Sequence, residues 1–491
     1  MNTVTPAVRT AWPRSVAFLL TVSALLALSG CASHLQGAGA PAAVAVEPAP
    51  STVPEWWKAV TKAAEGDPAF VGISAGVAEG SGRQTMAFGN SVLAPGATVT
   101  TSTRFRIGSV SKQFTSAAIL LLAEEGRLTL DDKVSRFLPE LQHSGEITIR
   151  QCLAHTSGYP DYYPLDFTDS RLATPIAPID LARRSTSGQL DFPPGDHFSY
   201  SNTGYVVAGL IVEKASGVSL GDFLQRRIFV PLGMVNTTIF DGPPVESRDA
   251  RGYTAFGLGP VSESLYESTG SLFGAGGIIS TPTDLTLWLL ALADGKVLRP
   301  ASLIEMTTPF RFNDGRISRY GLGLSIRSVN GYQIWGHSGA VAGFQTLVQV
   351  IPAKRTAVAI CINSEGSIID TFRDPLIALL TKPSVPAAPV VNGPTIEAVV
   401  REWIARYATG NIDRSQLSDE FAAYLTPERL AGTRPALAAL GAVQSVDVGT
   451  PAERGGFEVS SCKVTCRNGK LETVLYRNPN GKIEQFFVQR R

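Results

Sequence analysis

The most informative stretch of the chain is Phe105-Arg106-Ile107-Gly108-Ser109-Val110-Ser111-Lys112. It opens a segment that runs to Glu125 and stops at Gly126, which predicts a helix over residues 109–125. Side chains three residues apart share one face of a helix, so the amine of Lys112 can lie beside the hydroxyl of Ser109. A serine becomes a nucleophile when a neighbouring base takes its proton, and a lysine whose pKa is lowered by burial can be that base. The stretch therefore predicts a Ser109 nucleophile that Lys112 activates.

The start of this predicted helix adds a second favourable feature. The positive end of the helix dipole lies near the Ser109 oxygen and favours an oxyanion that develops there. The Ser-x-x-Lys spacing alone is a weak signal, because Ser460 and Lys463 repeat it. That second copy lies in a predicted strand, where the two side chains face opposite sides, so we interpret it as chance.

Two more motifs follow Ser109-Val110-Ser111-Lys112 along the chain. Tyr200-Ser201-Asn202 comes first, and Trp335-Gly336-His337-Ser338-Gly339 comes just before a predicted pair of strands. In this order the three motifs resemble those of the serine β-lactamase and penicillin-binding-protein superfamily. The branch that fits best contains class C β-lactamases, D-Ala-D-Ala carboxypeptidases, D-aminopeptidases and related serine esterases. The resemblance covers Pro54 to Leu380 and includes the flanking segments Phe105-Arg106-Ile107-Gly108, Arg127-Leu128-Thr129-Leu130-Asp131-Asp132, Leu153-Ala154-His155-Thr156-Ser157-Gly158, and Gly276-Gly277 with Thr281 and Asp284.

The resemblance implies a role for each matching residue. Ser109 attacks the substrate carbonyl and becomes acylated, and Lys112 deprotonates it. Tyr200 passes the proton to the leaving group, and Asn202 hydrogen-bonds the substrate amide. The backbone N–H groups of Ser109 and Ala340 form the oxyanion hole. Two alternatives stay open: Tyr200 as a core tyrosine with a satisfied hydroxyl, and Asn202 as a turn residue.

The third motif departs from the family pattern at His337. The β-lactamases and most carboxypeptidases carry a lysine there, whose ammonium binds the substrate carboxylate. A histidine is charged only part of the time near neutral pH, so we expect weaker, pH-dependent carboxylate binding by His337 and Gly339 and a visible His337 titration. Esterase and D-aminopeptidase relatives carry His-x-Gly, which leaves catalysis intact but puts strong β-lactamase activity in doubt. A structural strand role for His337 is the alternative.

Two other residues are alternative candidates for catalytic roles, Ser74 as a nucleophile and His155 as a base. Gly72-Ile73-Ser74-Ala75-Gly76 fits the G-x-S-x-G nucleophile elbow of α/β-hydrolases. That elbow requires a strand before the serine and a helix after it, whereas here the alternating strand pattern continues to Val77, so Ser74 is predicted as a strand residue. His155 could be a base, but we expect it to make a local hydrogen bond within its loop.

The pattern between Pro54 and Leu380 predicts an α+β fold, with an antiparallel sheet flanked by helices plus a helical subdomain. Alternating residues at 70–77 and a turn at 80–82 predict a pair of strands. Runs at 344–351 and 356–362 predict a hairpin near the other end of this region. Ser280-Thr281-Pro282 predicts the start of a helix that runs to about Leu292. The sheet is therefore expected to combine both ends of the region.

The remaining sequence divides the chain into five predicted parts. Residues 1–30 are a signal peptide, 31–53 an Ala/Pro-rich tether, 54–381 the hydrolase domain, 382–394 a Pro-rich linker, and 395–491 a small accessory α+β domain. In the last part, helical patterns at 396–407 and 427–440 precede strand-like runs near 443, 457 and 471. Asn480-Gly481 predicts a final hairpin.

The N-terminal segment predicts export and lipid anchoring. Arg9 and Arg14 precede an apolar run at 16–28 that is shorter than the about 20 residues of a membrane span. The run ends in Leu28-Ser29-Gly30-Cys31, which resembles the bacterial lipobox with Cys31 as the lipidated residue. This predicts a protein anchored by lipid at the bacterial membrane and facing the periplasm, and Ala32 favours the outer membrane. An ordinary secretory signal is the alternative.

Composition narrows the choice of partners. Hydrophobic residues make up 44% of the chain and the formal net charge is +1, so a nucleic-acid partner is not expected and a small molecule or peptide is. No Cys or His cluster has zinc spacing, which predicts no metal, and no cofactor is expected. Cys462 and Cys466 lie in a predicted strand roughly 13 Å apart, too far for a disulfide.

Three functions remain open at this point. The first is a serine hydrolase of small esters, amides or D-amino-acid peptides. The second is a β-lactamase or D-Ala-D-Ala carboxypeptidase, which differs in substrate rather than in chemistry. The third is a penicillin-binding or sensor lipoprotein that is acylated but scarcely turns over. Loss of a catalytic residue would favour the third, and none of the motif residues is missing.

Overall fold

A computed structural model describes residues 53–163, 173–240, 242, 246–255, 259–366, 368–381 and 388–490. The predicted signal peptide, the tether up to residue 52 and the lipidation residue Cys31 lie outside this part of the chain. Residues 382–387 of the predicted linker lie outside it as well. Among the described residues, the structure contains no helix with the length and hydropathy needed to cross a bilayer.

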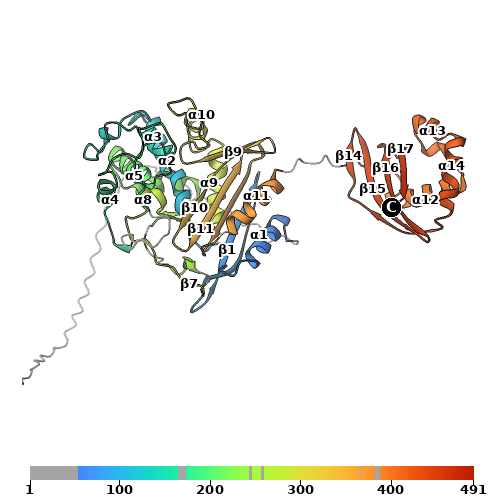
Figure 1. Cartoon of the computed structure of the whole chain (residues 1–491), viewed down its shortest axis with the longest axis horizontal. Coiled ribbons are helices and arrows are strands. Elements are labelled where there is room, and N and C mark those ends of the chain that lie inside the picture. The colour runs from blue at the N-terminus through green and yellow to red at the C-terminus, as the bar shows by residue number, and fades with distance from the viewer. Residues whose placement is uncertain are drawn as a thin grey trace, which may run out of the picture. The chain divides into compact units, whose positions relative to one another are not determined.

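A seven-stranded antiparallel sheet forms the centre of the first region (Figure 1). Its strand order is β3-β2-β1-β12-β11-β10-β9. The central pairing joins β1 to β12, with Ile73 opposite Ile362. The prediction that the sheet combines both ends of the region is therefore confirmed. The strands are β1 Gly72–Glu79, β2 Gly82–Val92, β3 Ala97–Thr98, β9 Ser325–Val329, β10 Tyr332–Val341, β11 Phe344–Ile351 and β12 Thr356–Ile362.

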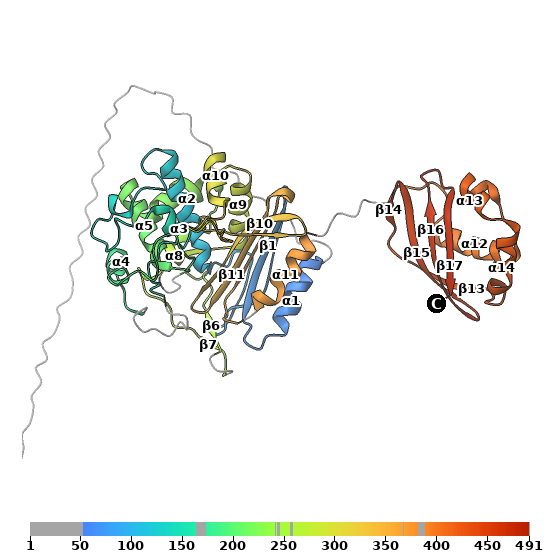
Figure 2. The ribbon, with the colours of Figure 1, turned by 45° about the horizontal axis from the view of Figure 1, so that its top comes forward.

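Helices cover both faces of this sheet, as Figure 2 shows from a second direction. On one face α1 (Glu55–Glu65) packs beside α11 (Ile368–Leu380), and their apolar side chains share a core with Ile73 of β1. On the other face α9 (Pro282–Ala293) packs on β1 and β12. Because both faces are covered, β1 is buried along almost its whole length, and Ser74 is a buried strand residue as predicted.

The three sequence motifs lie in and beside a helical insertion between β3 and β9. The predicted helix at 109–125 begins with a 3-10 turn at Gly108–Val110 and continues as α2 (Ser111–Glu124). Gly126 follows with a φ of 71°, a backbone conformation that favours glycine, which explains the stop. The other helices of the insertion are α3 Ile149–Leu153, α4 Pro178–Ser185, α5 Asn202–Ser216, α6 Leu220–Leu224, α7 Val230–Leu232, α8 Phe273–Gly276 and α10 Pro300–Thr307.

Short strands tie the insertion together. β4 (Phe105–Arg106) pairs with β8 (Ile278–Ser280), which also pairs with β5 (Thr238–Ile239). β6 (Tyr253–Thr254) and β7 (Ser262–Glu263) form a separate pair. Thr281 caps α9 by accepting a hydrogen bond from the Asp284 N–H, as its sequence predicted. The mixture of antiparallel sheet and packed helices confirms the predicted α+β class.

The region after residue 394 has a core of its own. It consists of helices followed by an antiparallel sheet in the order β13-β15-β16-β17, with β14 paired to β15. The hairpin at Asn480-Gly481 joins β16 to β17, and Cys462 and Cys466 of β15 are free thiols, both as predicted. The proposed domain boundaries stay a prediction. The elements are α12 Ile396–Thr409, α13 Asp419–Tyr424, α14 Pro427–Ala438, β13 Val443–Val448, β14 Ala452–Arg454, β15 Phe457–Cys466, β16 Gly469–Arg477 and β17 Ile483–Arg490.

Candidate active site

The amine of Lys112 lies at the centre of the site, on the first turn of α2. Its Nζ donates hydrogen bonds to Ser109 Oγ at 3.0 Å, to Asn202 Oδ1 at 2.7 Å and to the Ala275 carbonyl at 2.8 Å. The side chain is fully buried. The structure therefore places the Lys112 amine beside the Ser109 hydroxyl, the arrangement that their spacing predicts.

Burial changes the acid–base behaviour of Lys112. It lowers the pKa of Lys112 to about 7, and the carboxylate of Asp161 opposes this shift. All three hydrogen-bond acceptors of the amine are uncharged, and within the described residues Lys112 forms no ion pair. A buried ammonium without an anion in contact loses much of its preference for the charged form. Lys112 can therefore act as a base near neutral pH.

Tyr200 lies in contact with both members of this pair. The Lys112 amine is 4.9 Å from the centroid of the Tyr200 ring. The phenol oxygen is buried and has no hydrogen-bond partner among the described residues. Burial raises the pKa of Tyr200 well above its usual range, and the nearby Ser109 hydroxyl opposes the shift. Tyr200 is thus a neutral phenol at physiological pH, with a proton available to donate.

Asn202 lies between Lys112 and Asp161 in the structure. It is the first residue of α5, and its amide nitrogen lies 3.1 and 3.2 Å from the two carboxylate oxygens of Asp161. Its backbone N–H also donates to Asp161, at 3.0 Å. The carbonyl end of the side chain accepts from Lys112. In this arrangement Asn202 links Lys112 to Asp161, and its predicted hydrogen bond to a substrate amide stays a prediction.

The backbone around the predicted oxyanion hole is tightly packed. A side chain at Gly339 of β10 would come within 2.0 Å of the Ile107 carbonyl and 3.1 Å of the Ser109 nitrogen. A side chain at Gly108, whose φ is 51°, would come within 2.9 Å of the Ala340 nitrogen. Only glycine allows two backbones to approach this closely. The close approach brings the N–H groups of Ser109 and Ala340 into one small region.

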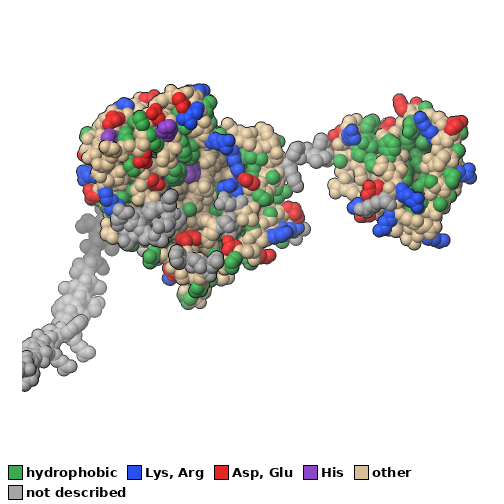
Figure 3. All heavy atoms as spheres, viewed as in Figure 1, with side chains coloured by type: hydrophobic (Ala, Val, Ile, Leu, Met, Phe, Trp, Pro, Cys, Tyr) green, Lys and Arg blue, Asp and Glu red, His purple; other side chains and the backbone are tan. Residues whose placement is uncertain are grey.

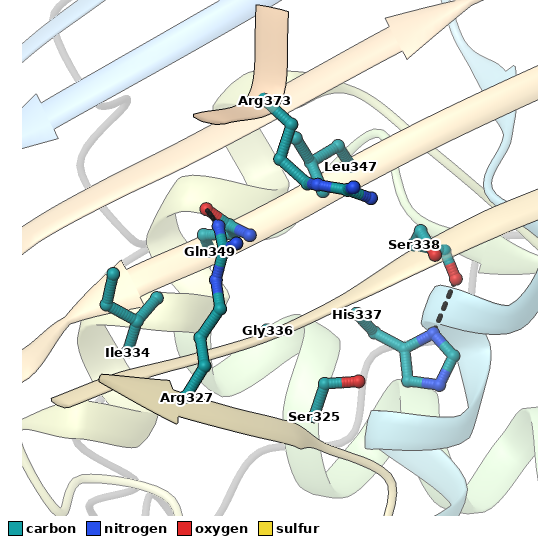
Figure 4. Close-up of a pocket in the computed structure, with 9 residues that line it drawn as sticks. All are labelled: Ser325, Arg327, Ile334, Gly336, His337, Ser338, Leu347, Gln349 and Arg373. Carbon is teal, nitrogen blue, oxygen red and sulfur yellow. Dashed lines mark hydrogen bonds between the residues drawn. The ribbon is translucent and has the colours of Figure 1, made fainter. Parts of the chain in front are cut away.

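His337 differs most from the prediction. It is 6% exposed, and its Nδ1 donates to the Ser338 carbonyl at 2.5 Å (Figure 4). Its Nε2 lies 2.8 Å from the Tyr320 hydroxyl. Burial lowers the pKa of His337 to about 3, and the charge of Lys112 adds to the effect. The expectation that His337 is partly charged near neutral pH, and titrates there, is wrong because the ring is buried beside the Lys112 amine and has no anionic partner among the described residues.

His155 has a larger structural role than the sequence suggested. Its Nδ1 accepts a hydrogen bond from the backbone N–H of Ser201, which lies in a distant part of the sequence. Its ring lies against Tyr200 at 4.1 Å between centroids and against Tyr320 at 4.9 Å. Burial lowers the pKa of His155 well below its usual value. The expected local hydrogen bond is therefore wrong, and His155 supports the second motif instead.

A buried carboxylate that sequence reasoning missed connects the walls of the site. Glu267 accepts hydrogen bonds from Arg106 Nη1 at 2.7 Å and from the Ala342 N–H at 2.9 Å. The Tyr163 hydroxyl also donates to it. These contacts link β4, which precedes Ser109, to the end of β10. An acidic residue far from the motifs gives no local sequence signal of this kind.

A cavity of about 130 Å³ lies beside the third motif (Figure 4). His337 and Ser338 of β10 line it together with Gln349 of β11, Arg327 of β9 and Arg373 of α11. Arg327 is paired with Asp374 at 3.0 Å and donates to Gln349. Two guanidinium groups therefore face the same small cavity. Elsewhere on the face seen in Figure 3, acidic and basic side chains are interspersed.

The side chains gathered here are a hydroxyl, an amine, a phenol and an amide. Within the described residues, no group of three or more His, Cys, Asp or Glu side chains could hold a metal ion. The structure thus brings together Ser109, Lys112, Tyr200 and Asn202, with Gly339 and Ala340 beside them. The catalytic roles of these residues stay predictions.

Comparison with known proteins gives a consistent result. The family model described as Beta-lactamase matches residues 58–382. Penicillin-binding protein 4* of Bacillus subtilis is 33% identical over 284 residues, which are 54% of this chain and 62% of that protein. D-aminopeptidase of Brucella canis is 28% identical over 310 residues, which are 62% of this chain and 58% of that protein. The chain therefore spans less than two thirds of the length of these relatives.

Solved structures show the same likeness. The D-stereospecific amidohydrolase from Streptomyces sp. is 28% identical, with a TM-score of 0.56 over 65% of this chain and 97% of that one. The D-amino acid amidase from Ochrobactrum anthropi SV3, complexed with L-phenylalanine amide, is 28% identical, with a TM-score of 0.56 over 67% and 98%. These matches confirm the predicted resemblance. Together with the family model, which spans more than half of the sequence, they show that the chain belongs to the beta-lactamase family.

Proposed function

We propose that this protein is a serine hydrolase that forms an acyl-enzyme at Ser109. The observation that carries the proposal is the buried Lys112 amine, which lies 3.0 Å from Ser109 Oγ and has a pKa lowered to about 7. An amine with this pKa is neutral in a large fraction of molecules at physiological pH and can take the serine proton. The family to which the chain belongs supports the same chemistry.

The geometry supports the following acylation step. Neutral Lys112 takes the Ser109 proton as the serine oxygen bonds to the substrate carbonyl carbon. The resulting oxyanion lies near the backbone N–H groups of Ser109 and Ala340, which can donate to it. The new ammonium stays bonded to Asn202 Oδ1 and the Ala275 carbonyl, two acceptors already in place before the reaction.

The leaving group needs a proton when its bond to the carbonyl carbon breaks. The Tyr200 phenol can donate this proton because burial keeps it neutral, and the Lys112 ammonium can then restore it. Water completes the cycle by attacking the Ser109 ester, with the same two groups moving the protons in reverse. This sequence releases the acid and regenerates the free serine.

The proposed substrates are amides or peptides of D-amino acids, together with small esters. The similarity to a D-aminopeptidase and to D-amino acid amidases supports this class. The charges of the site support it as well. The Asp161 carboxylate lies next to Asn202, where it can attract a substrate ammonium, and neutral His337 supplies no positive charge for an anionic substrate.

A second candidate is hydrolysis of β-lactams or of peptides ending in D-Ala-D-Ala. The similarity to penicillin-binding protein 4* favours it, and so do Arg327 and Arg373, which could attract a substrate carboxylate into the cavity beside Ser338. A panel of D-amino acid amides, p-nitrophenyl esters, nitrocefin and D-Ala-D-Ala peptides separates the candidates. A burst of acylation without turnover on every member would instead favour the sensor function.

The nucleophile is tested by covalent labelling. We expect Ser109→Ala to abolish labelling by a fluorophosphonate or β-lactam probe while the protein stays folded. Ser111→Ala is the matched control, because this nearby serine is buried and its hydroxyl accepts only from the Ile278 N–H among the contacts seen here. Labelling of Ser109→Ala at the wild-type level would move the nucleophile to another residue.

We also propose that the protein is exported and anchored by lipid on Cys31. The apolar run at 16–28 and the Leu28-Ser29-Gly30-Cys31 sequence support this. Growth with a labelled fatty acid tests it, since wild-type protein should take up label and Cys31→Ser should not. Cell fractionation of the same strains distinguishes the inner membrane, the outer membrane and the periplasm. An unlabelled wild-type protein found free in the periplasm would favour the ordinary secretory signal.

A further inference from the structure

Three aromatic rings, those of His155, Tyr320 and His337, gather beside Tyr200. Tyr200, His155, Tyr320 and His337 form this aromatic cage, which we define by these four residues. The ring centroids of Tyr200 and His337 are 6.2 Å apart, and those of Tyr320 and His337 are 5.6 Å apart. Phe198 covers the cage from outside, 5.7 Å from both His155 and Tyr320.

The hydrogen bonds of His337 determine which of its nitrogens carries a proton. A carbonyl oxygen can only accept, so the contact with the Ser338 carbonyl requires a proton on Nδ1. In a neutral imidazole Nε2 is then an acceptor, and the Tyr320 hydroxyl at 2.8 Å must be the donor. Both nitrogens are thus occupied within the protein, and neither is available to a substrate.

Burial and the charge of Lys112 disfavour a positive charge on His337, and they outweigh the hydrogen bond to the Ser338 carbonyl, which favours it. Lys112 is the nearest titratable cation on the α2 side, and it lowers the pKa of His337. Tyr200 and His155 are uncharged, and the cavity on the other side carries the guanidinium groups of Arg327 and Arg373. None of the described residues that line this cavity is a carboxylate, and the Asp374 carboxylate lies behind the two guanidinium groups, 3.0 Å from Arg327 and 3.6 Å from Arg373. His337 therefore stays neutral although it occupies the position of the family's lysine.

We propose that Tyr320 is a positioning residue that acts through His337, and that the two form a neutral hydrogen-bonded pair which holds the ring of Tyr200. The pair contributes neither a proton nor a charge to the reaction. Its effect on catalysis rests on the function proposed above, because it places the phenol that donates to the leaving group. The effect of the Tyr320 hydrogen bond on the protonation of His337 does not depend on that function.

The first test measures the His337 ring directly. In ¹⁵N–¹H spectra of the full-length protein, we expect His337 to be neutral, with the proton on Nδ1, at every pH from 5 to 8. The other four histidines of the chain serve as internal references, each assigned by its own substitution. A proton on Nε2, or a charged ring in this range, would overturn the proposal while leaving the Ser109 labelling result unaffected.

The second test uses kinetics and rescue by a conservative variant. His337→Leu removes the acceptor for Tyr320, and we expect kcat to fall by about tenfold to a hundredfold, as for other displaced catalytic groups, with little change in KM. In His337→Gln the amide oxygen can take the place of Nε2, so we expect it to recover most of the lost kcat with the same pH profile. Equal losses in the two variants would show that a histidine function other than accepting is needed.

The third test asks whether Tyr320 and His337 act as one unit. Tyr320→Phe keeps the ring and removes the hydroxyl, so we expect a loss in kcat close to that of His337→Leu. The double variant should lose no more than either single variant, because residues that act together are not additive. Tyr407→Phe is the control for a buried tyrosine hydroxyl elsewhere, bonded to the Phe486 carbonyl. Multiplicative losses in the double variant would contradict the proposal.

Discussion

The two largest antiparallel sheets among the described residues each have a cation buried beside them, and the surroundings of Lys112 and Arg477 differ. Lys112 is bonded to a hydroxyl, an amide oxygen and a backbone carbonyl, all uncharged. Arg477 of β16 is bonded to the Glu458 carboxylate at 2.5 and 2.7 Å. Burial without an anion in contact favours loss of the proton, whereas burial with one favours a fixed charge. The first environment creates a base, and the second stabilises a fold.

The connectivity of the two sheets explains why the predicted catalytic motifs meet beside the first. Its strands come from both ends of the region, and the helical insertion between them reaches the open end of β10. The second sheet is built mainly from consecutive strands, β15, β16 and β17, joined by short turns. No long segment interrupts these three strands.

Replacing Lys112 should produce the largest effect. In Lys112→Met the base is lost, and we expect kcat/KM to fall by about 10³-fold or more, the range for a general base. The wild-type kcat/KM should rise with pH through about 7, because Lys112 must lose its proton to act. Lys214→Met, at an exposed position of α5, is the control. A variant that retains activity would show that Lys112 is only structural.

Removing the buried Arg477–Glu458 ion pair should lower the free energy of unfolding and leave kcat/KM unchanged. Arg477→Met leaves Glu458 buried without its partner, which costs about 3 kcal/mol or more of unfolding free energy. Replacing both residues, in Arg477→Met/Glu458→Leu, should recover much of this loss because no unpaired charge remains. Chemical denaturation followed by circular dichroism measures the stability, and hydrolysis assays measure kcat/KM. A loss of activity in the folded variant would contradict the comparison.

The neutral state of His337 predicts a dependence of stability on acid. In the unfolded chain a histidine takes up a proton near its ordinary pKa of about 6.5, whereas folded His337 does so only near about 3. Between these values the unfolded state binds more protons, so stability falls as pH is lowered, by about 1.4 kcal/mol per pH unit. His337→Gln should remove this part of the slope. Identical slopes in the two proteins between pH 6 and 4 would show that His337 titrates normally.

Asp161 should have the smallest effect of the four. Its negative charge raises the pKa of Lys112, so Asp161→Asn should lower that pKa further and move the rise in kcat/KM to lower pH. The asparagine can still accept hydrogen bonds from Asn202. Asp314→Asn, at an exposed loop position, is the control for a general change in charge. A shift to higher pH would mean that Asp161 does not act on Lys112 through its charge.

The sequence predicted the parts of the site that depend on local spacing. The approach of Lys112 to Ser109 follows from one helical turn, and the order of the three motifs identified the family. The sheet was predictable because alternating apolar runs at both ends of the region needed partners. These features are encoded within a few residues, so a pattern can detect them.

The parts that were missed depend on tertiary structure. Asp161, Tyr320 and Glu267 belong to no motif, and only folding brings them to the site. The charge of His337 was misjudged for a related reason. A pKa near 6.5 assumes water around the ring, and no sequence pattern reports that Tyr320 and the Ser338 carbonyl replace it.

The pairing of β1 with β12 also affects how the chain folds during synthesis. Ile73 of β1 pairs with Ile362 of β12, so the centre of the sheet cannot form before residue 362 has been synthesised. Contacts between such distant positions slow folding, because a long loop must be ordered before the pairing stabilises it. During synthesis, β1 has no β12 to pair with until the chain has been extended past residue 362. The centre of this sheet can therefore form only after almost all of the first region has been synthesised.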